Sequence, residues 1–253
     1  MTLKTNKVAW ITGGGTGIGK ELTLILAEKN YDVIISGRRK EKLIETAKNN
    51  KKKIHPIPLD VKNPIQCKKV SETIYKKFKK IDLLILNAAI YSPGSMTKIC
   101  TKEAKKVIDI NLLGVLNCLS PVAKIMQENK EGHVVFVSSP AGYQGLPGGG
   151  FYGVTKSALT FLAETLNIEF HKSNIKVQVV NPGFVKTPMT DKNSFFMPFL
   201  MTPNNAAKKI SEKLESSDFE IFFPKKLIIP MKLLRLLPYS IYFFLIKKLI
   251  KLP

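Results

Sequence analysis

The segment VAWITGGGTGIGKEL, residues 8–22, places five glycines within seven positions, between an apolar run and a helical pattern. The apolar run at 8–12 predicts a buried strand, and the pattern over 20–29 is typical of an amphipathic helix. A glycine-rich turn between a strand and a helix lets backbone N–H groups approach a pyrophosphate at the positive N-terminus of that helix. The segment therefore predicts a dinucleotide site, with a tight strand-to-helix turn that holds no ligand as the alternative.

Short β-branched apolar runs alternate with helical patterns over most of the 253 residues. Further strands are expected at 32–37, 53–60, 81–88, 133–139, 176–182 and 219–223, and helices at 64–79 and 101–127. Most of these runs are continuous rather than alternating, as in a parallel sheet that is covered on both faces. The sequence predicts an α/β, Rossmann-like, doubly wound parallel sheet of about seven strands in a single domain, residues 1–223, with 224–253 as an extension.

The formal net charge of +21 favours anionic partners in general. Only three of the basic residues are arginines, namely Arg38, Arg39 and Arg235, and the lysines are spread along the chain without interleaved aromatic residues. Arginine is the residue that forks onto phosphates and bases, so the pattern indicates a solvated lysine surface and no nucleic-acid partner.

The cysteines and histidines are scattered, three of each, without a CxxC pair. This spacing predicts neither a disulfide framework nor a metal site. No stretch reaches the roughly 18 apolar residues of a membrane-spanning helix, and the chain enters its first strand without the regions of a signal peptide. We therefore expect a cytoplasmic protein.

Four further segments follow the glycine turn in order: LDV at 59–61, LNAA at 86–89, SSPAGYQGLPGGGFYGVTK at 138–156 and NPGFVKT at 181–187. Together with Thr12-Gly13-xxx-Gly17-x-Gly19 they resemble the short-chain dehydrogenase/reductase family, whose fingerprint is TGxxxGxG. The resemblance covers roughly residues 7–190. Ala89 replaces a glycine that is usual in this family, and the chain end after residue 223 departs from the common pattern. The resemblance implies a homo-oligomeric oxidoreductase.

The resemblance also implies the residues of the site. The catalytic set would be Asn111, Ser139, Tyr152 and Lys156. The cofactor contacts would be Thr12, Gly13, Thr16, Gly17, Ile18, Gly19, Arg38, Arg39, Asp60, Val61, Asn87, Tyr152, Lys156, Pro182, Gly183, Val185 and Thr187. In this family pattern the asparagine kinks its helix and anchors a water through which protons reach the lysine.

The spacing of Tyr152 and Lys156 has a chemical meaning of its own. Four residues apart, they share one face of a helix, and an ammonium beside a phenol lowers a phenol pKa that starts near 10. Tyr152 would donate a proton to a carbonyl oxygen as hydride arrives, and Ser139 would hydrogen-bond the same oxygen. An isolated Y-x-x-x-K is usually a surface pair, and Ser139 is chosen over Ser138 on spacing alone.

The segment SGRRK at 36–40 bears on the choice of cofactor. Sites that prefer NAD place an acid at the end of the second strand, whereas a 2′-phosphate favours a cation there. Two of the three arginines lie at this point and no acid precedes Glu41. The sequence predicts NADP(H), with Arg38 as the main contact and Arg39 in support; a basic helix start is the alternative.

A substrate lid is expected at about 188–203, where aromatic and methionine side chains crowd between prolines. Such side chains adapt to apolar shapes, which favours a hydrophobic or lipid-like ketone or secondary alcohol. Ordinary core packing is the alternative for this segment. A non-catalytic NADP-binding sensor or scaffold is the alternative for the whole chain, since a fold does not by itself give a function.

The tail at 224–253 carries apolar runs that prolines and lysines interrupt. Over 240–252 a helix would group apolar residues on one side and basic residues on another; the apolar ones are Ile241, Phe244, Leu245, Leu249 and Leu252, the basic ones Lys247, Lys248 and Lys251. The pattern predicts peripheral attachment to an anionic membrane surface, on the inner face of a membrane. Burial against the sheet or a partner subunit is the alternative.

Overall fold

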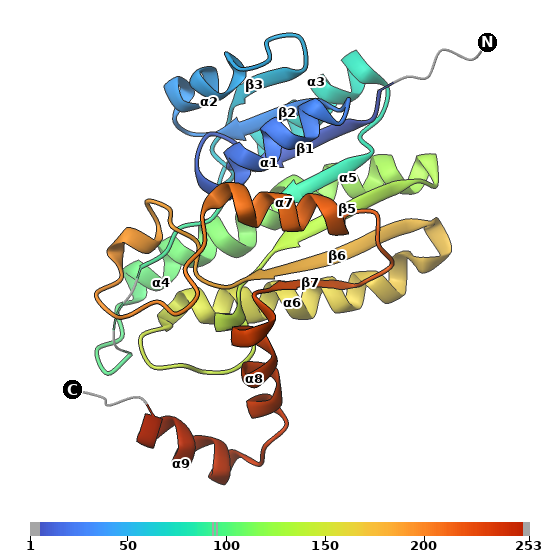
Figure 1. Ribbon diagram of the computed structural model, residues 1–253. Helices are drawn as coiled ribbons and strands as arrows, with labels where there is room; N and C mark the ends of the chain where they lie inside the picture. The colour runs from blue at the N-terminus through green and yellow to red at the C-terminus, as the bar shows by residue number, and fades with distance from the viewer. Residues whose placement is uncertain (1–5, 93, 95, 250–253) are drawn as a thin grey trace.

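Seven parallel strands form one twisted sheet in the order β3-β2-β1-β4-β5-β6-β7 (Figure 1). The computed structural model describes residues 6–92, 94 and 96–249. The strands are β1 (Val8–Thr12), β2 (Asp32–Gly37), β3 (Ile54–Pro58), β4 (Leu83–Leu86), β5 (Gly132–Val137), β6 (Ile175–Pro182) and β7 (Glu220–Phe223). The predicted doubly wound α/β fold is confirmed. Because the chain runs outward from β1 first to β3 and then to β7, the switch in strand order lies between β1 and β4.

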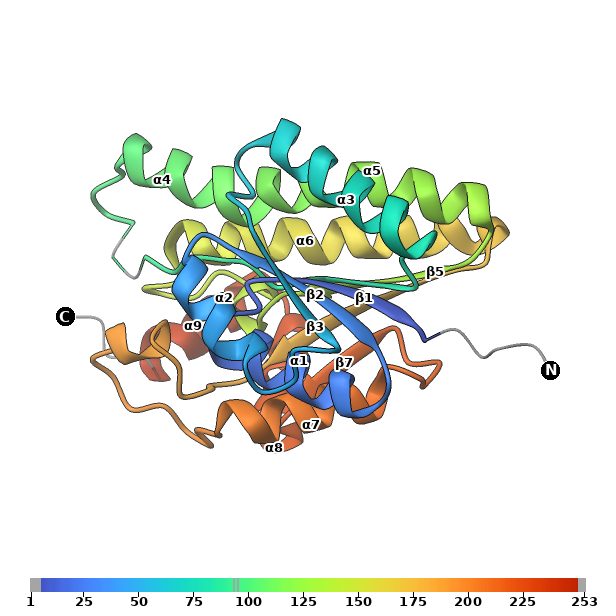
Figure 2. The same ribbon diagram turned by 90° about the horizontal axis from the view of Figure 1, so that it is seen from above.

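Helices cover both faces of the sheet (Figure 2). One layer contains α3 (Pro64–Phe78), α4 (Thr101–Ile108), α5 (Gly114–Asn129) and α6 (Gly150–Glu169). The opposite layer contains α1 (Gly17–Glu28), α2 (Lys40–Ala47) and α7 (Pro203–Lys213). Short helical turns at Asp109–Leu113, Pro140–Gly142, Phe170–Ser173 and Thr190–Lys192 complete the domain.

Alternate residues of each strand supply the two halves of the core. In β1, Trp10 packs toward α3, α5 and α6, while Ala9 and Ile11 pack toward α1, α2 and α7. The Trp10 side chain is 0 % exposed, and its indole N–H donates to Ser36 Oγ at 3.0 Å. Because both faces of the strand are buried, its sequence is continuously apolar, which is the pattern that predicted a parallel sheet.

Two helices begin with the cap that their sequence provides. The Asn63 side chain accepts from Gln66 N at 3.0 Å at the start of α3, and Thr202 Oγ1 accepts from Asn205 N at 3.2 Å at the start of α7. Each cap residue is followed by a proline, whose fixed φ suits the first helical turn and which has no N–H to satisfy. These caps explain why both helices begin at a loop–proline boundary.

The helix Thr101–Asn129, which joins α4, a π-helical turn and α5, is long and apolar enough to cross a membrane, with a mean hydropathy of 1.3 over its best 18 residues. This differs from the expectation that no stretch would reach that composition. Of that window 39 % is buried, and Val115, Leu119 and Val122 face the sheet. Packing in the core accounts for the buried part of this apolar window.

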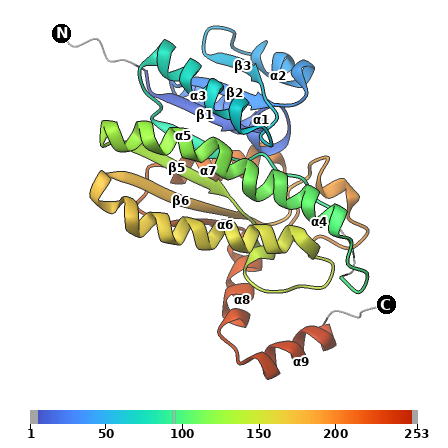
Figure 3. The same ribbon diagram turned by 180° about the vertical axis from the view of Figure 1, so that it is seen from behind.

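The chain after β7 forms two helices, α8 (Lys225–Arg235) and α9 (Tyr239–Leu249), below the β7 edge of the sheet (Figure 3). α8 lies against the turn that follows β6, because a Cβ on Gly183 would lie 2.9 Å from Pro224 and 3.1 Å from Leu227. α9 covers the described part of the helix predicted at 240–252 and begins one residue earlier; Lys251 and Leu252 lie outside the described residues. Both helices belong to the folded structure rather than to a loose extension.

Candidate functional site

A pocket of about 1710 Å³ lies at the carboxyl ends of the strands and extends to the 188–203 segment. In parallel α/β sheets this end, at the switch in strand order, is where ligands bind. Every residue predicted to contact cofactor or substrate lines this pocket except Thr12, Gly19 and Asn111. The structure therefore brings together segments that are up to about 170 residues apart in the sequence, from the glycine turn to Thr187.

The glycine turn between β1 and α1 is locked onto Asn87. The Asn87 side-chain amide donates to Thr12 O at 3.0 Å and to Gly13 O at 3.3 Å. Gly13 has a φ of +74°, and a Cβ there would lie 2.8 Å from that amide nitrogen; a Cβ on Gly19 would lie 2.4 Å from Gly13 O. Side chains at these two positions would displace the turn, which explains why the segment contains so few of them.

Thr12 and Gly19 support the turn from behind. Thr12 Oγ1 accepts hydrogen bonds from the backbone N–H groups of Asn87 at 3.0 Å and Ala88 at 3.1 Å. This ties the end of β1 to the loop that leaves β4, across the switch in strand order. Both residues thus shape the pocket from outside its wall.

The rest of the wall around the glycine turn comes from two other segments. Asp60 and Val61 follow β3, and Asp60 Oδ1 accepts from Lys62 N at 3.1 Å. Pro182, Gly183, Val185 and Thr187 follow β6 on the opposite side. A Cβ on Gly17 would lie 3.1 Å from the Thr187 side chain, so the turn after β6 closes onto the glycine turn. The space between them is an elongated groove with backbone N–H groups at the N-terminus of α1, as a pyrophosphate requires.

Three cations gather where β2 meets α2: Arg38, Arg39 and Lys42. Arg39 donates to Thr16 Oγ1 at 3.1 Å, and Lys42 pairs with Glu45 at 2.8 Å. Among the described residues, Arg38 makes neither an ion pair nor a side-chain hydrogen bond. Its guanidinium is therefore available to an anionic group in the groove.

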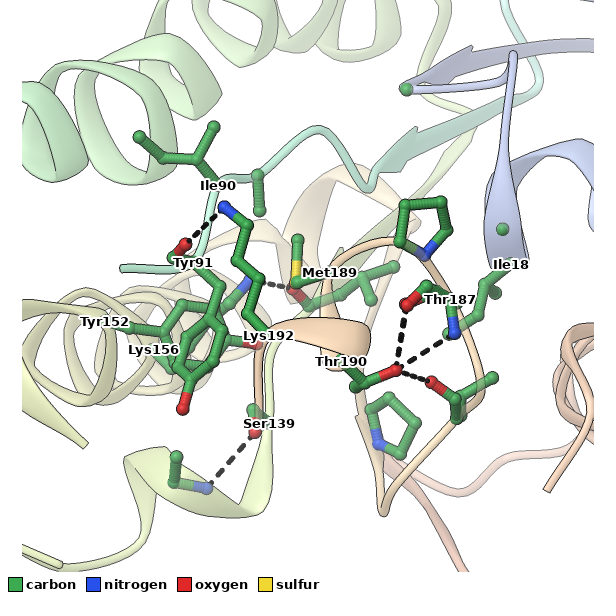
Figure 4. Close-up of a pocket in the computed structure, with 18 of the residues that line it drawn as sticks. Ile18, Ile90, Tyr91, Ser139, Tyr152, Lys156, Thr187, Met189, Thr190 and Lys192 are labelled. Atoms are coloured by element: carbon green, nitrogen blue, oxygen red, sulfur yellow. Dashed lines mark hydrogen bonds between the residues drawn. The ribbon is translucent and has the colours of Figure 1, made fainter. Parts of the chain in front are cut away.

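Ser139, Tyr152 and Lys156 lie on one side of the pocket, and Ile18 and Thr187 lie on the other (Figure 4). Ser139 begins the turn after β5, and its Oγ accepts from Ala141 N at 3.2 Å. Ser138 is buried and donates to Lys156 O at 2.8 Å. Because the Ser138 hydroxyl is occupied in holding the helix, Ser139 is the serine whose hydroxyl can meet a ligand.

The expectation that Lys156 lowers the pKa of Tyr152 is wrong for this structure. Burial raises the pKa of Tyr152 to about 12, and a hydrogen bond with Ser139 only partly offsets that rise. Burial also lowers the pKa of Lys156 to about 7, and its ammonium donates to Val137 O at 2.7 Å, 5.3 Å from the centre of the Tyr152 ring. Desolvation by the pocket outweighs the attraction between the two groups.

Asn111 lies behind the pocket, within a π-helical turn at Asp109–Leu113. Its side chain is 0 % exposed, accepts from Ile90 N at 2.8 Å and donates to Ile90 O at 2.9 Å and to Thr155 Oγ1 at 3.3 Å. It thereby joins the 87–91 segment to the helix that carries Tyr152. The irregular helix that the resemblance implied is present at this residue.

The segment at 188–203 lies over the pocket, and Met189, Thr190, Lys192 and Phe195 contribute to its wall. Thr190 Oγ1 donates to Val185 O at 2.6 Å, which fixes the start of the segment beside the cofactor groove. The alternative of ordinary core packing is wrong, because Phe195, Phe196, Phe199 and Leu200 are exposed, Phe196 by 87 %.

Sequence reasoning missed several pocket residues, among them Lys42, Tyr91, Leu227 and Met231. The Tyr91 ring meets the Tyr152 ring edge-on at 5.0 Å. Lys42 lies one helical turn after Arg38 and could have been found from that spacing. Leu227 and Met231 come from α8, and no local pattern places that helix against the pocket.

Comparisons with known proteins agree with this site. Residues 7–195 match the family model for short chain dehydrogenase. An uncharacterized oxidoreductase from Myxococcus xanthus (strain DK1622) is 30 % identical over 245 residues, covering 96 % of this chain and 97 % of that protein. The 3-oxoacyl-(acyl-carrier-protein) reductase FabG of Thermotoga maritima is 35 % identical over 189 residues, 74 % of this chain and 77 % of that protein. The solved structure of ElxO with NADP bound has 31 % identity and a TM-score of 0.78, over 86 % of this chain and 97 % of that one.

Proposed function

The chain belongs to the short-chain dehydrogenase/reductase family of oxidoreductases, which use NAD(P)(H), and from that premise we propose that it interconverts a ketone and a secondary alcohol with NADP(H). The observation that carries the proposal is one pocket in which a dinucleotide groove runs into Ser139, Tyr152 and Lys156. When bound, the nicotinamide supplies or accepts the hydride. The residues of this chain provide the binding and the proton.

The groove fits a dinucleotide on its own geometry. A Cβ on Gly13 or Gly19 would collide with Asn87 or with Gly13 O, so the absence of side chains there keeps the turn tight, and Thr187 closes the opposite side. The 2′-phosphate of NADP would be held by Arg38, Arg39 and Lys42, since no carboxylate of the described residues occupies the end of β2. The NADP-bound state of a relative 31 % identical, ElxO, supports the same choice.

Tyr152 acts as the acid in the reducing direction. A phenol whose pKa is raised to about 12 by burial is protonated at neutral pH and is ready to donate to a carbonyl oxygen. Ser139 donates to the same oxygen and holds it next to the phenol. Lys156, with a pKa lowered to about 7, can exchange protons with water near neutral pH and thereby restores the proton that Tyr152 loses.

The substrate half of the pocket favours an apolar ketone or alcohol. Its wall includes Met96, Leu146, Phe184, Phe195 and Met231, which are flexible or aromatic apolar side chains. The relative FabG is a 3-oxoacyl reductase, a protein that reduces a ketone on an acyl chain, which supports the same substrate class here. We therefore propose a hydrophobic ketone or secondary alcohol as the substrate.

The experiment is NADPH oxidation by the purified chain with a panel of ketones of increasing chain length, repeated with Tyr152→Phe. We expect turnover that grows with chain length and that falls by roughly 100-fold or more in the variant, because general acid catalysis contributes about 10²- to 10⁴-fold. The matched control is Tyr75→Phe, which removes a phenol hydroxyl from α3, away from the pocket.

The outcomes separate the two hypotheses. Tight NADPH binding without turnover on any carbonyl, or on any alcohol with NADP, would return the non-catalytic sensor or scaffold to first place. Turnover of short polar ketones in preference to long apolar ones would refute the substrate class and leave the reaction intact.

A further inference from the structure

Exposed apolar side chains concentrate at the C-terminal end of the described chain. Among the described residues, 22 large apolar side chains are exposed, and eight of them lie between residues 225 and 249. Leu236 is 79 % exposed and Phe244 is 64 % exposed. Monomeric proteins rarely leave such groups in a contiguous patch without a use. The eight are Ile229, Leu233, Leu236, Tyr239, Ile241, Phe243, Phe244 and Leu249.

The charge of the same segment has one sign. Residues 224–253 contain seven lysines and arginines and no aspartate or glutamate. Lys232 is bound to Glu220 of β7, whereas Lys225, Lys226, Arg235, Lys247 and Lys248 are exposed beside the apolar side chains. Apolar residues bordered by cations match the interface of an anionic bilayer, where acyl chains lie below a layer of phosphate groups.

α9 is held in place by its inner face. Tyr242, 3 % exposed, donates from its hydroxyl to Gly145 O at 2.7 Å, and Ile246 is buried beside it. The outer side chains are therefore presented by a docked helix. The 143–149 loop that α9 contacts also forms part of the pocket wall, through Leu146 and Pro147.

The segment at 188–203 lies on the same side of the molecule as α9 (Figures 1 and 3). Phe195, Phe196 and Phe199 of this segment are exposed, as are the apolar side chains of the tail. The pocket also reaches α8, because Leu227 and Met231 line it. Exposed apolar side chains thus occur both on the C-terminal helices and on the segment that covers the pocket.

We propose that α8, α9 and the lid form a membrane-binding surface that rests on an anionic bilayer. A second copy of the chain is the weaker occupant, because a symmetric contact would bring the five exposed cations of one tail against those of the other, and neither tail contains a carboxylate side chain. An anionic lipid surface neutralises these charges and buries the apolar groups at once. A hydrophobic substrate would then enter the pocket from the bilayer, and this consequence rests on the proposed function.

Vesicle flotation of the full chain tests the proposal. The vesicles are pure phosphatidylcholine, or phosphatidylcholine in which about a third of the lipid is phosphatidylglycerol. We expect the bound fraction to be roughly tenfold higher on the anionic vesicles, and to fall roughly tenfold in Leu236→Glu/Phe244→Glu and in Lys247→Glu/Lys248→Glu. The matched control for the first variant is Ile44→Glu/Ile65→Glu, two exposed isoleucines of α2 and α3 with the same change in charge as Leu236→Glu/Phe244→Glu.

Each outcome decides for or against the surface. Retained binding of the control with loss in both tail variants supports it, provided that thermal unfolding shows all three variants folded. No binding by the unmodified chain, equal binding to both vesicles, or equal loss in the control overturns it. If the unmodified chain stays unbound and the tail variants change from dimer to monomer in light scattering, the surface is a contact between copies. Flotation uses no substrate, so its failure leaves the proposed reaction untouched, and NADPH oxidation of a short ketone tests that reaction separately.

Discussion

Replacing Arg38 by aspartate tests the choice of cofactor most directly. Arg38 follows β2, lines the groove and has no ion-pair partner among the described residues, so a 2′-phosphate would be its principal contact. Arg39 and Lys42 are already engaged with Thr16 and Glu45. The substitution removes the free cation and places there the acid that binds the 2′-hydroxyl in NAD-preferring sites.

The size of the effect follows from the contacts. A hydrogen bond to a charged group contributes about 1.5–3 kcal/mol, and a carboxylate about 4 Å from the phosphate adds repulsion of about 1 kcal/mol in a solvated site. A total of roughly 3 kcal/mol corresponds to about a 100-fold loss, at about 1.4 kcal/mol for each factor of ten. Arg39 and Lys42 remain in the variant, so the loss stays well below complete inactivation.

The assay is kcat/KM for NADPH and for NADH with one ketone at fixed ionic strength. We expect the NADPH value to fall about 100-fold and the NADH value to stay constant or rise a few-fold, since an exposed hydrogen bond contributes about 1 kcal/mol. The control is Lys40→Asp, which makes the same change of charge two residues away and outside the pocket wall. Equal losses in Arg38→Asp and Lys40→Asp, or an unmodified chain that prefers NADH, would refute the reasoning.

Three other perturbations have defined outcomes. Burial lowers the pKa of Lys156 to about 7, whereas the unfolded lysine titrates near 10.5, so the unfolded chain binds more protons between these pH values. The free energy of unfolding should therefore rise by about 1 kcal/mol per pH unit from pH 7 upward. Chemical denaturation at several pH values should show this slope in the unmodified chain and not in Lys156→Met. Asn111→Leu leaves the N–H and C=O of Ile90 without their partner, so we expect the free energy of unfolding to fall by about 2–4 kcal/mol, or Tm by roughly 5–15 °C. Asn111→Asp should lose less, because it retains the acceptor for the Ile90 N–H. Met231→Trp fills the α8 side of the pocket, and kcat/KM should fall roughly tenfold for long ketones and little for short ones, whereas equal losses would place Met231 outside the substrate path.

The strand pattern could be read from the sequence because both faces of this sheet are buried. All seven predicted strands exist, and β1 and β2 have the predicted bounds. The run at 81–88 was too long, since β4 ends at Leu86. There the N–H of Asn87 turns to Thr12 Oγ1 instead of continuing the ladder. A hydrophobic pattern locates a strand, but the hydrogen bond that ends it comes from a residue 75 positions away.

The features of the site also divide into those that the sequence could predict and those that it could not. Residues that belong to a local motif, such as Tyr152 and Lys156 on one helical turn, could be found from spacing and lie in the pocket. Their pKa values could not, because burial by the lid and by Tyr91 depends on tertiary structure. The same holds for Leu227 and Met231, whose place in the wall depends on how α8 docks.

One partly buried carboxylate contributes to that docking. Glu220 of β7 accepts hydrogen bonds from Tyr143, from Asn181 at 2.7 Å and from Lys232 of α8. Burial alone would raise its pKa, but the hydrogen bonds from Lys232, Tyr143 and Asn181 hold the pKa of Glu220 below its usual value, so it stays ionised as a fixed acceptor. Tyr143 belongs to the loop after Ser139, and Asn181 immediately precedes the turn beside the cofactor groove. A single charge therefore connects the serine loop, the cofactor turn and the C-terminal helix.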